Sequence, residues 1–489
     1  MAPWGSYRRI PFDRNRDSQR FYNHGRKIKD LAQPNEPWFQ EVLAASGMRD
    51  CMLCYHTIHN GMLVAFAERW HPETSLFHLP HSEITITLDD VACLLHLPIR
   101  GTLFRHGRMT EAKAQEMLIV ELGADPDDAL EEVERARGAH VRFSFLQRQY
   151  DAELTAAHQA EGDELEQATL REWVLRCYFL YLIDTQLFVD TSLTYTNAVY
   201  LTYLSDTTCI HEYNWGAVVL AYGYHKLEDG CLWKTRTVAG NCTLLVGWIL
   251  QHFPDIIGWG EVEEYTEVML CASSFTPLRG NQVPDPYRRG LNRMAAEDIR
   301  YCCYDEHLET VLFDEIALYS EWLAANSTII VRYLPERVMR QFGYEQTIPR
   351  DPIVSIPIAM TRMQLQEVFA DWKHHLVPEE ARATRAEHDW SCAEGYITWY
   401  YSLTYMLPAA EGGPSKPAHE EILRAHQAQL DHTQNLLPLC RQIVDRGIRA
   451  IAEGLFLEGT ASRRVLDDMI RLIESAFLYR RHRSGWYAG

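Results

Sequence analysis

The chain has 489 residues, a formal net charge of −20, and 47% apolar residues that include 13 Trp and 25 Tyr. That apolar content supplies a large core and excludes a wholly disordered chain, and the length exceeds the ~250 to 300 residues of a single core. The negative charge excludes a protein that binds nucleic-acid phosphates over a broad surface, unless positive charge is concentrated locally.

Positive charge is concentrated at the beginning of the chain. Residues 1–30 hold eight Arg or Lys against three Asp, and they show no apolar periodicity. We therefore expect residues 1–36 to form a flexible basic arm. The same residues lack the apolar segment of a signal peptide, so the 12 cysteines are expected to stay reduced in the cytosol or nucleus.

The segment from 68 to 101 changes its apolar period several times. A helix predicted over 49–70 is ended by Pro72, because proline removes a backbone donor and clashes with the preceding turn. Apolar and polar residues then alternate, which predicts a small β-hairpin near 76–88. Thr87 with Asp90 three residues later predicts a capping box at the start of the next helix.

The rest of the chain has mainly helical patterns, with acidic, solvated faces over 106–170. Gly and Pro at 408–418 predict a linker, which makes 406–489 a linker followed by a C-terminal helical unit. The predicted fold class is mainly α, a large multi-helix globular domain over 37–405. Further helices are expected at 38–45, 171–190, 196–204, 215–227, 242–253, 313–323, 335–342, 361–374 and 387–405, with a short strand at 327–333.

Four stretches, in this order, carry a resemblance to a known family. The first contains Glu-Arg-Trp-x-Pro-Glu-Thr from residue 68 and Thr-Ile-Thr-Leu-x-Asp-Val-Ala from residue 85. The others are Tyr-Asn-Trp-Gly-Ala at 213–217, Tyr-Leu-Pro-Glu-Arg-Val-Met-Arg-Gln-Phe-Gly at 333–343 and Tyr-Ile-Thr-Trp-Tyr at 396–400. Over residues 38–405 the chain resembles the plant mobile domain family of transposon-derived, maintenance-of-meristems-like proteins. It departs from the family at 301–304, where Tyr-Cys-Cys-Tyr replaces the usual Trp-x-Pro-Tyr.

The resemblance implies a non-catalytic nuclear protein that binds other proteins and acts in transposon silencing, gene expression and genome maintenance. It also implies a serine/threonine phosphatase-like partner of the long-form type-7 kind. The alternative is a transposon-encoded nucleic-acid-binding or transposition accessory protein, with weak or indirect nucleic-acid association. A third reading is an unrecognised enzyme, but the sequence has no nucleophile elbow, P-loop or dinucleotide fingerprint. We therefore expect no enzymatic activity and no cofactor.

The family motifs are expected to be structural. Trp70, Trp215 and Phe342 each lie beside a predicted helix boundary, where a large ring can hold two elements together. The full set of motif residues with this expected role is Arg69, Trp70, Pro72, Glu73, Asn214, Trp215, Gly216, Phe342 and Gly343.

The stretch at 335–343 also offers a candidate binding surface. In a two-turn helix its apolar side chains would form one stripe, and two arginines and a glutamine would lie on the opposite, exposed side. That arrangement predicts an arginine face for phosphate or an acidic peptide. The alternative, favoured by the surplus of negative charge, is that the arginines pair with the chain's own carboxylates. The candidate binding residues are Arg337, Arg340, Gln341, Trp399 and Tyr400.

One cluster has the residue types of a metal site. Cys51, Cys54, His56 and His59 lie within nine residues. On a single helix these side chains fan over more than one face and do not surround a tetrahedral ion. We therefore expect a structural amphipathic helix and no metal.

Overall fold

The computed structural model describes residues 17–403 with gaps at 53, 57, 161, 193, 233–234, 278–281, 306, 308–310 and 357–359, and single positions between 450 and 466. The chain divides into two compact units. The main unit is Phe12–Ile356 with Thr361–Tyr396, and the second is Met1–Pro11, Pro357–Met360 and Ile397–Gly489. Apart from those single positions, the predicted linker and C-terminal helical unit at 406–489 lie outside the described residues.

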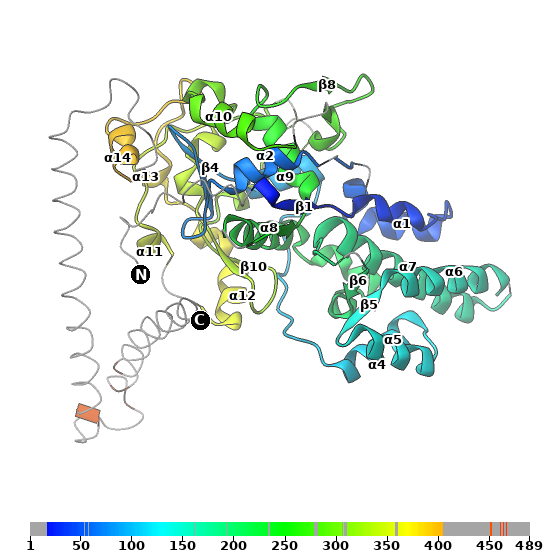
Figure 1. Cartoon of the computed structure of the whole chain (residues 1–489). Coiled ribbons are helices and arrows are strands. Elements are labelled where there is room, and N and C mark those ends of the chain that lie inside the picture. Colours follow the sequence, from blue (N-terminus) through cyan, green and yellow to red (C-terminus); the bar gives the residue numbers. More distant parts are fainter. Residues whose placement is uncertain are drawn as a thin grey trace. The chain divides into compact units, whose positions relative to one another are not determined.

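The described residues are mainly helical, which confirms the predicted fold class at this level (Figure 1). None of the described helices is long and apolar enough to cross a membrane. The α-helices are α1 (Pro37–Ala45), α2 (Asn60–Ala67), α3 (Leu88–Leu95), α4 (Glu111–Leu122), α5 (Pro126–Ala136), α6 (Phe143–Gln159), α7 (Glu164–Leu182), α8 (Trp215–Cys231), α9 (Cys242–His252), α10 (Asp285–Arg293), α11 (Pro352–Ser355), α12 (Arg362–Ala370), α13 (Glu379–Arg382) and α14 (Tyr396–Leu403).

Short 3-10 helices and one π-helix connect these elements. The π-helix is η4 (Ile183–Leu187), which continues α7. The 3-10 helices are η2 (Gly25–Asp30), η3 (Asp50–Met52), η5 (Ala198–Tyr203), η6 (Thr207–Glu212), η7 (Cys271–Ser274), η8 (Ala296–Asp298), η10 (Glu315–Leu318), η11 (Pro335–Arg337), η12 (Met339–Phe342) and η13 (Trp372–His375).

The described strands form small sheets. Strands β2, β3 and β4 form a three-stranded antiparallel sheet, and the other strands pair as β1–β7, β5–β6, β8–β9 and β10–β11, of which only β1–β7 is parallel. Their bounds are β1 (Arg20–Tyr22), β2 (Trp70–His71), β3 (Leu76–His78), β4 (Glu83–Ile84), β5 (His140–Arg142), β6 (Tyr195–Asn197), β7 (Thr237–Ala239), β8 (Trp259–Glu261), β9 (Phe275–Pro277), β10 (Glu321–Ala324) and β11 (Ile330–Tyr333).

Helix α8 is central in the main unit, where it packs against α2, α3, β2, β10 and β11. Asn214 caps it as predicted, because its Oδ1 accepts from the Ala217 amide at 2.7 Å. The Asn214 amide also donates to Ile99 O at 2.5 Å, which ties the helix start to the segment after α3. Gly216 is required here, since a Cβ would lie 2.9 Å from Pro98 O.

The segment at 76–88 has one strand pair and then a helix cap. Strands β3 and β4 pair at Phe77–Ile84 and His78–Glu83, and β2 adds a third strand at Trp70–Phe77. The expected second strand is shorter than the alternating pattern, because the Thr85 backbone bonds the Gln341 side chain instead of a strand. The predicted capping box of Thr87 and Asp90 then starts α3.

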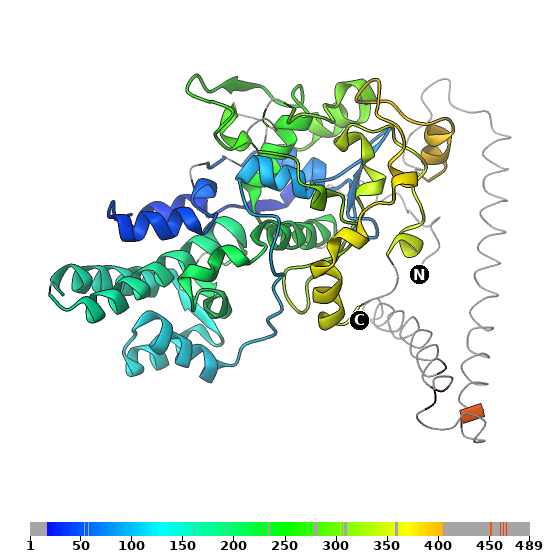
Figure 2. The same cartoon turned by 180° about the vertical axis from the view of Figure 1, so that it is seen from behind.

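Helices α4 to α7 gather at one end of the main unit, away from β4 and α10 (Figures 1 and 2). The segment predicted as one helix over 171–190 is the end of α7 followed by the π-helix η4. The acidic residues of α4 and α5 are largely exposed, as a solvated face requires.

The predicted flexible arm is wrong for residues 17–36. Strand β1 pairs in parallel with β7, and Phe21 is buried with its amide donating to Asn60 Oδ1 at 2.9 Å. Ile28 and Leu31 are buried as well. Backbone pairing and a few apolar side chains hold this segment, and neither produces a periodic pattern. Residues 1–16 lie outside the described residues.

Two predicted helices are also corrected. The segment at 313–323 forms η10 and then β10, because Glu321–Ala324 pairs antiparallel with Ile330–Tyr333. The segment at 49–70 contains only the 3-10 helix η3 and the eight-residue α2, and its last residues turn into β2.

Removing residues 1–30 should destabilise the main unit. The deletion removes β1 and the buried side chains of Phe21 and Ile28, each worth roughly 1.5 to 3 kcal/mol. We expect the free energy of unfolding to fall by about 3 to 6 kcal/mol, measured by chemical denaturation. Deletion of residues 1–16 is the control, and equal stability of the two truncated proteins would contradict the assignment.

Trp215→Ala should cost about 3 to 5 kcal/mol. Trp215 is fully buried, packs on Phe104 at 5.0 Å between ring centroids, and donates its indole N–H to Ile210 O at 2.8 Å. Trp390→Ala is the matched control, since that side chain is 42% exposed and should change the melting temperature far less. Equal melting temperatures would refute the structural role of Trp215.

Candidate functional site

The charged residues of the motifs converge on a carboxylate in strand β4. Glu83 is buried, and Arg337 of η11 binds it through two parallel bonds of 2.9 and 2.7 Å. His78 Nε2 lies 2.9 Å from the same carboxylate. Burial alone would raise the pKa of Glu83, but Arg337 and His78 outweigh burial and hold that pKa at about 2. Glu83 is therefore a carboxylate at neutral pH, fully committed to partners inside the protein.

The exposed arginine face at 335–343 is wrong, because Arg337, Arg340 and Gln341 are buried. The favoured alternative, pairing with the chain's own carboxylates, is confirmed at Arg337, whose partner is Glu83. Arg340 donates to Ser391 O at 3.1 Å and lies over the rings of Tyr301 and Tyr396. The segment is two 3-10 helices, separated at Val338, whose φ of −132° and ψ of 37° leave the helical region. Side chains four residues apart therefore do not keep the phase of an α-helix, and the arginines turn inward.

Asp90 is the centre of a second part of this network. Its Oδ2 accepts from the Thr87 amide at 2.6 Å and from the Thr87 hydroxyl at 2.7 Å. Its Oδ1 lies 2.8 Å from His252 Nε2 and accepts from the Tyr304 hydroxyl at 2.7 Å. Gln341 reaches the same carboxylate at 3.4 Å. Asp90 thus joins α3, α9, the segment at 301–304 and η12.

Sequence reasoning missed the role of Tyr301 and Tyr304. Tyr301 donates to Ser82 Oγ at 2.8 Å, and Tyr304 donates to Asp90. Both rings are buried, so both hydroxyls need internal partners. The departure from the family pattern at 301–304 marked the segment, but nothing in the sequence pairs it with residues more than 200 positions earlier.

Arg69, a motif residue, belongs to another buried polar cluster. Its guanidinium donates to Ala65 O at 2.6 Å and to Asn292 Oδ1 at 2.7 Å. Its neighbour Glu68 receives two bonds of 2.8 and 2.5 Å from Arg288 of α10. These contacts hold α10 against α2 and explain why a charged pair precedes Trp70.

The remaining motif residues have packing or turn roles, with two exceptions. Trp70 is buried against Phe77 and Tyr224 at 4.9 Å between ring centroids. Phe342 is buried, and Gly343 ends η12 in the left-handed region with φ of 74°. The exceptions are Pro72, which is half-buried, and Glu73, whose side chain is exposed.

Trp399 and Tyr400 lie on α14, in the second unit from Ile397 onward. Tyr400 is fully buried, so the expected exposed aromatic at this position is wrong. Trp399 is half-buried.

The cluster at 51–59 does not converge on one point. Cys54 Sγ lies 3.6 Å from His56 Nε2 and donates to Ala272 O at 3.2 Å, whereas Cys51 Sγ donates to Met48 O at 2.9 Å. Across the part of the chain that the structure describes, no group of three or more His, Cys, Asp or Glu is placed to hold a metal ion. Burial raises the pKa of the Cys54 thiol to about 12, so this thiol stays protonated.

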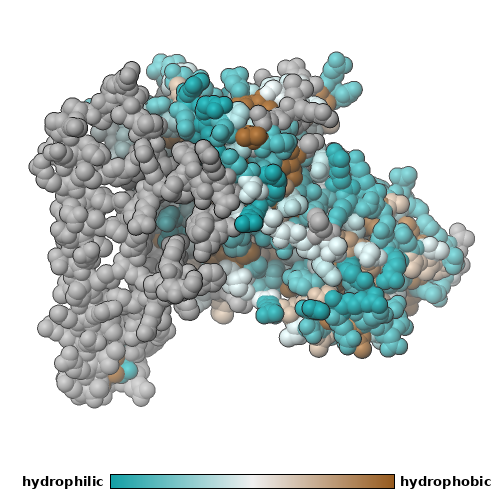
Figure 3. Space-filling view, in the orientation of Figure 1, coloured by the Kyte–Doolittle hydropathy of each residue, from teal (hydrophilic) through white to brown (hydrophobic). Residues whose placement is uncertain are grey.

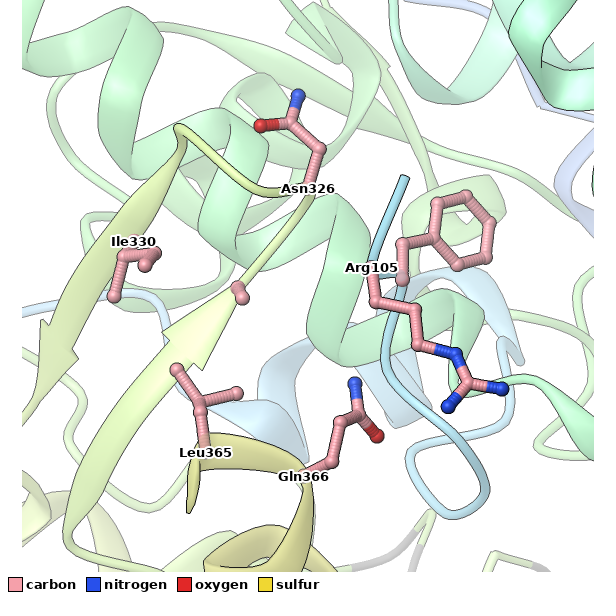
Figure 4. Close-up of a pocket in the computed structure, with 7 residues that line it drawn as sticks. Arg105, Asn326, Ile330, Leu365 and Gln366 are labelled. Atoms are coloured by element: carbon pink, nitrogen blue, oxygen red, sulfur yellow. The ribbon is translucent and has the colours of Figure 1, made fainter. Parts of the chain in front are cut away.

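A small pocket lies beside β10 and α12 (Figure 4). Its volume is ≈ 10 Å³, about the space that one water molecule needs. Gln366 on its wall is already bonded to Leu103 O at 2.8 Å. The pocket is therefore too small for an organic substrate. Its lining residues are Phe104, Arg105, Ala324, Asn326, Ile330, Leu365 and Gln366.

Several buried carboxyl groups have raised pKa values, and the largest shifts are those of Asp89 and Asp184. Burial, Asp90 and Asp314 raise the pKa of Asp89 to about 7. Burial and Asp190 raise the pKa of Asp184, in the π-helix, well above its usual value. Shifts of this size occur at active sites, but buried structural groups show them as well.

Comparisons with known proteins identify a family. The model of the plant mobile domain matches residues 48–401. The chain is 30% identical to Protein MAIN-LIKE 1 of Arabidopsis thaliana over 298 residues, which are 60% of this chain and 56% of that protein. It is 24% identical to Protein MAINTENANCE OF MERISTEMS of the same plant over 298 residues, 60% of this chain and 59% of that protein.

A third relative from Arabidopsis thaliana is named Serine/threonine-protein phosphatase 7 long form homolog. It is 26% identical over 315 residues, which are 59% of this chain and 22% of that protein. The chain thus spans little more than half of the first two relatives and less of the third. No solved structure matches the chain.

Arg337→Met should destabilise the protein by about 3 to 5 kcal/mol at pH 7, because it removes the bidentate partner of the buried Glu83 carboxylate and leaves only His78 beside it. The wild-type pair lowers the folded pKa of Glu83 from 4.5 to about 2. Its contribution is complete above pH 4.5 and is lost as the pH falls towards 2. In the variant the Glu83 carboxyl has lost its permanently charged partner and is most costly when ionised, so stability should rise as the pH falls.

Denaturant unfolding between pH 7 and pH 3 measures this difference. Arg135→Met is the control, because Arg135 is 56% exposed and pairs with Glu131 on the surface; its effect should stay below about 1 kcal/mol. A variant at position 337 with wild-type stability at pH 7 would refute the role of the pair.

Proposed function

Because the chain belongs to the plant mobile domain family, we propose that it is a non-catalytic module that binds other proteins in the nucleus. Its proposed roles are those that the family resemblance implies: transposon silencing, gene expression and genome maintenance. Its proposed partner is a serine/threonine phosphatase-like protein.

The observation that carries the proposal is the internal use of the motif charges. Arg69, Arg337 and Arg340 are each buried and bonded to groups of the same chain. A catalytic group has to touch its substrate, and a phosphate-binding arginine has to reach solvent. The motif arginines meet neither requirement, which supports a scaffold whose contacts with other molecules lie elsewhere.

The phosphatase-named relative supports the class of partner. A region of 315 residues similar to this chain occurs in that protein together with other sequence, because the match covers only 22% of it. A similar region therefore occurs both in a protein named as a phosphatase and in proteins without that name. This distribution supports a functional association between the domain and a phosphatase-like protein.

The exposed surface that best fits a partner is a strap, defined here as residues 384–396. The strap is hydrogen-bonded along 343–346, with Ala386 N donating to Gly343 O at 3.0 Å and Gln346 N donating to Ser391 O at 3.2 Å. It carries Trp390, which is 42% exposed. Ile348, which is 49% exposed, lies beside Gly395 of the strap. Exposed aromatic and aliphatic side chains on a fixed backbone are typical of interface hot spots.

The rest of the described surface has few large exposed apolar side chains close together. The face in Figure 3 is mostly hydrophilic where it is described, with apolar residues in small separate areas. Large exposed apolar side chains such as Leu165, at 80%, stand among the charged residues of α7. A compact anchor is therefore more consistent with this protein than a broad apolar interface.

Affinity purification of the tagged full-length chain from plant nuclei tests the proposal. We expect a phosphatase-like protein to co-purify, and we expect Trp390→Ser combined with Ile348→Ser to reduce its recovery at least about tenfold, the loss of a hot spot. Leu165→Ser is the matched control, because it removes an exposed apolar side chain of the acidic helical region and should leave recovery unchanged.

Two results would overturn this proposal. One is wild-type recovery of the partner by the double variant, with unchanged melting temperature, which removes the strap from the interface. The other is metal-dependent strand cleavage by the purified protein that a single carboxylate substitution abolishes, which would make the protein an enzyme acting on nucleic acid.

A further inference from the structure

The strap is bracketed by residues whose backbones lie in the positive-φ region. Ala383, directly before the strap, has φ of 57° and ψ of −162°, and Gly395 near its end has φ of 84°. Glycine adopts such angles readily, whereas a residue with a side chain almost never adopts those of Ala383. Strain of this kind persists only where surrounding contacts hold it. The strap therefore has a strained turn at one end and a permissive glycine at the other.

Polar contacts hold the strap in place. Besides its backbone bonds to the segment beneath it, Arg385 donates to Phe342 O at 2.9 Å, and Asp389 Oδ2 accepts from the Cys302 amide at 3.3 Å. Every residue from 384 to 395 is half-buried or exposed, so these contacts bury little apolar surface. A segment held by exposed hydrogen bonds opens at a lower free energy than an apolar core.

The chain on each side of the strap is fixed. Before it, Val377 is fully buried and its amide donates to Leu318 O at 2.8 Å. At its end, Tyr396 is fully buried. A movement of the strap is therefore confined to the residues between these anchors. Ala383 and Gly395 are the positions at which the backbone can absorb the change in φ and ψ that such a movement requires.

The strap contacts one of the two buried motif arginines directly. Arg340 is 2% exposed, and its Nε donates to Ser391 O of the strap at 3.1 Å. Arg337 is 1% exposed, but its two bonds are to Glu83 in β4. Removing the strap would take away a partner of Arg340 and leave the partner of Arg337 in place.

We propose that the strap is a hinged cover, which opens as one unit about Ala383 and Gly395 while the rest of the main unit stays folded, and that its opening uncovers Arg340. The strain at Ala383 favours opening, because it is released when the turn relaxes. The polar contacts of the strap favour closure. The structure holds the closed form.

The movement also affects the surface assigned to the partner. Trp390 lies on the moving part, whereas Ile348 lies on the fixed segment, beside Gly395. Opening separates these two side chains, so the closed form alone presents both. This consequence rests on the proposed function, whereas the hinged movement itself does not.

Modification of the full-length protein with phenylglyoxal, an arginine-specific reagent, tests the movement when the modified peptides are quantified by mass spectrometry. Arg337 is the internal control, because it is as buried as Arg340 but its release requires separation from β4. We expect Arg340 to react at least about tenfold faster than Arg337, as local opening is easier than opening of the core. Urea below the unfolding transition should change the Arg340 rate little, since local opening exposes little surface.

Substitutions at the strained turn should change this rate in opposite directions. Ala383→Gly should slow the modification of Arg340 at least about threefold, because glycine relieves the strain of the closed form. Ala383→Val should accelerate it, since a β-branched side chain is still less compatible with positive φ. Ala386→Gly is the matched control, because that backbone lies outside the positive-φ region, and it should not slow the reaction. Hydrogen exchange of the Ala393 amide, which bonds Gln346 O at 3.0 Å, should follow the same order.

Equal rates at Arg340 and Arg337 that rise together with urea would overturn the proposal, because both residues would then require global unfolding. Unchanged rates in both variants at position 383, with folding verified by melting curves, would overturn it as well, since Arg340 would then react in the closed form. Failure of a phosphatase-like protein to co-purify with the wild type would refute the proposed function and leave these rates unaffected.

Discussion

The bidentate pair of Arg337 and Glu83 joins segments 254 residues apart, and the central packing of the main unit depends on it. A buried carboxylate without partners is among the most costly groups in a protein interior. Once Glu83 is placed in β4 by its pairing with β3, the segment at 335–342 has to lie against that sheet. The Gln341 side chain then accepts from the Thr85 backbone amide and donates to the Thr85 carbonyl oxygen. A further strand would otherwise pair with this part of the backbone.

Local features of the fold could be predicted from the sequence. The caps at Thr87 and Asn214 and the apolar helices that follow them depend on residues within one turn of each other, and they agree with α3, α8 and α9. The orientation of Arg337 and Arg340 could not be predicted in this way. It depends on Val338, whose backbone interrupts the helix, and on Glu83, which lies in another part of the chain.

The incorrect prediction of a flexible arm has the same cause, a contact with a distant segment of the chain. A composition rich in arginine indicated an arm at residues 1–36, but β1 is held by backbone hydrogen bonds to β7. Amino-acid composition does not show which backbone groups pair.

A polar core costs desolvation, and well-packed apolar residues often stabilise a protein as much or more. What charged groups add is a defined position, because a bidentate or multi-partner contact is satisfied in one arrangement only. Arg340 shows why that matters here. It lies over Tyr301 and Tyr396 on the inside and donates to Ser391 O in the strap. The exposed Trp390 is the neighbour of Ser391, so the buried network sets the position of the side chain that we assign to partner binding. Under the proposed function, substitutions in the network act on recognition through the backbone of the strap, because the network residues themselves are buried.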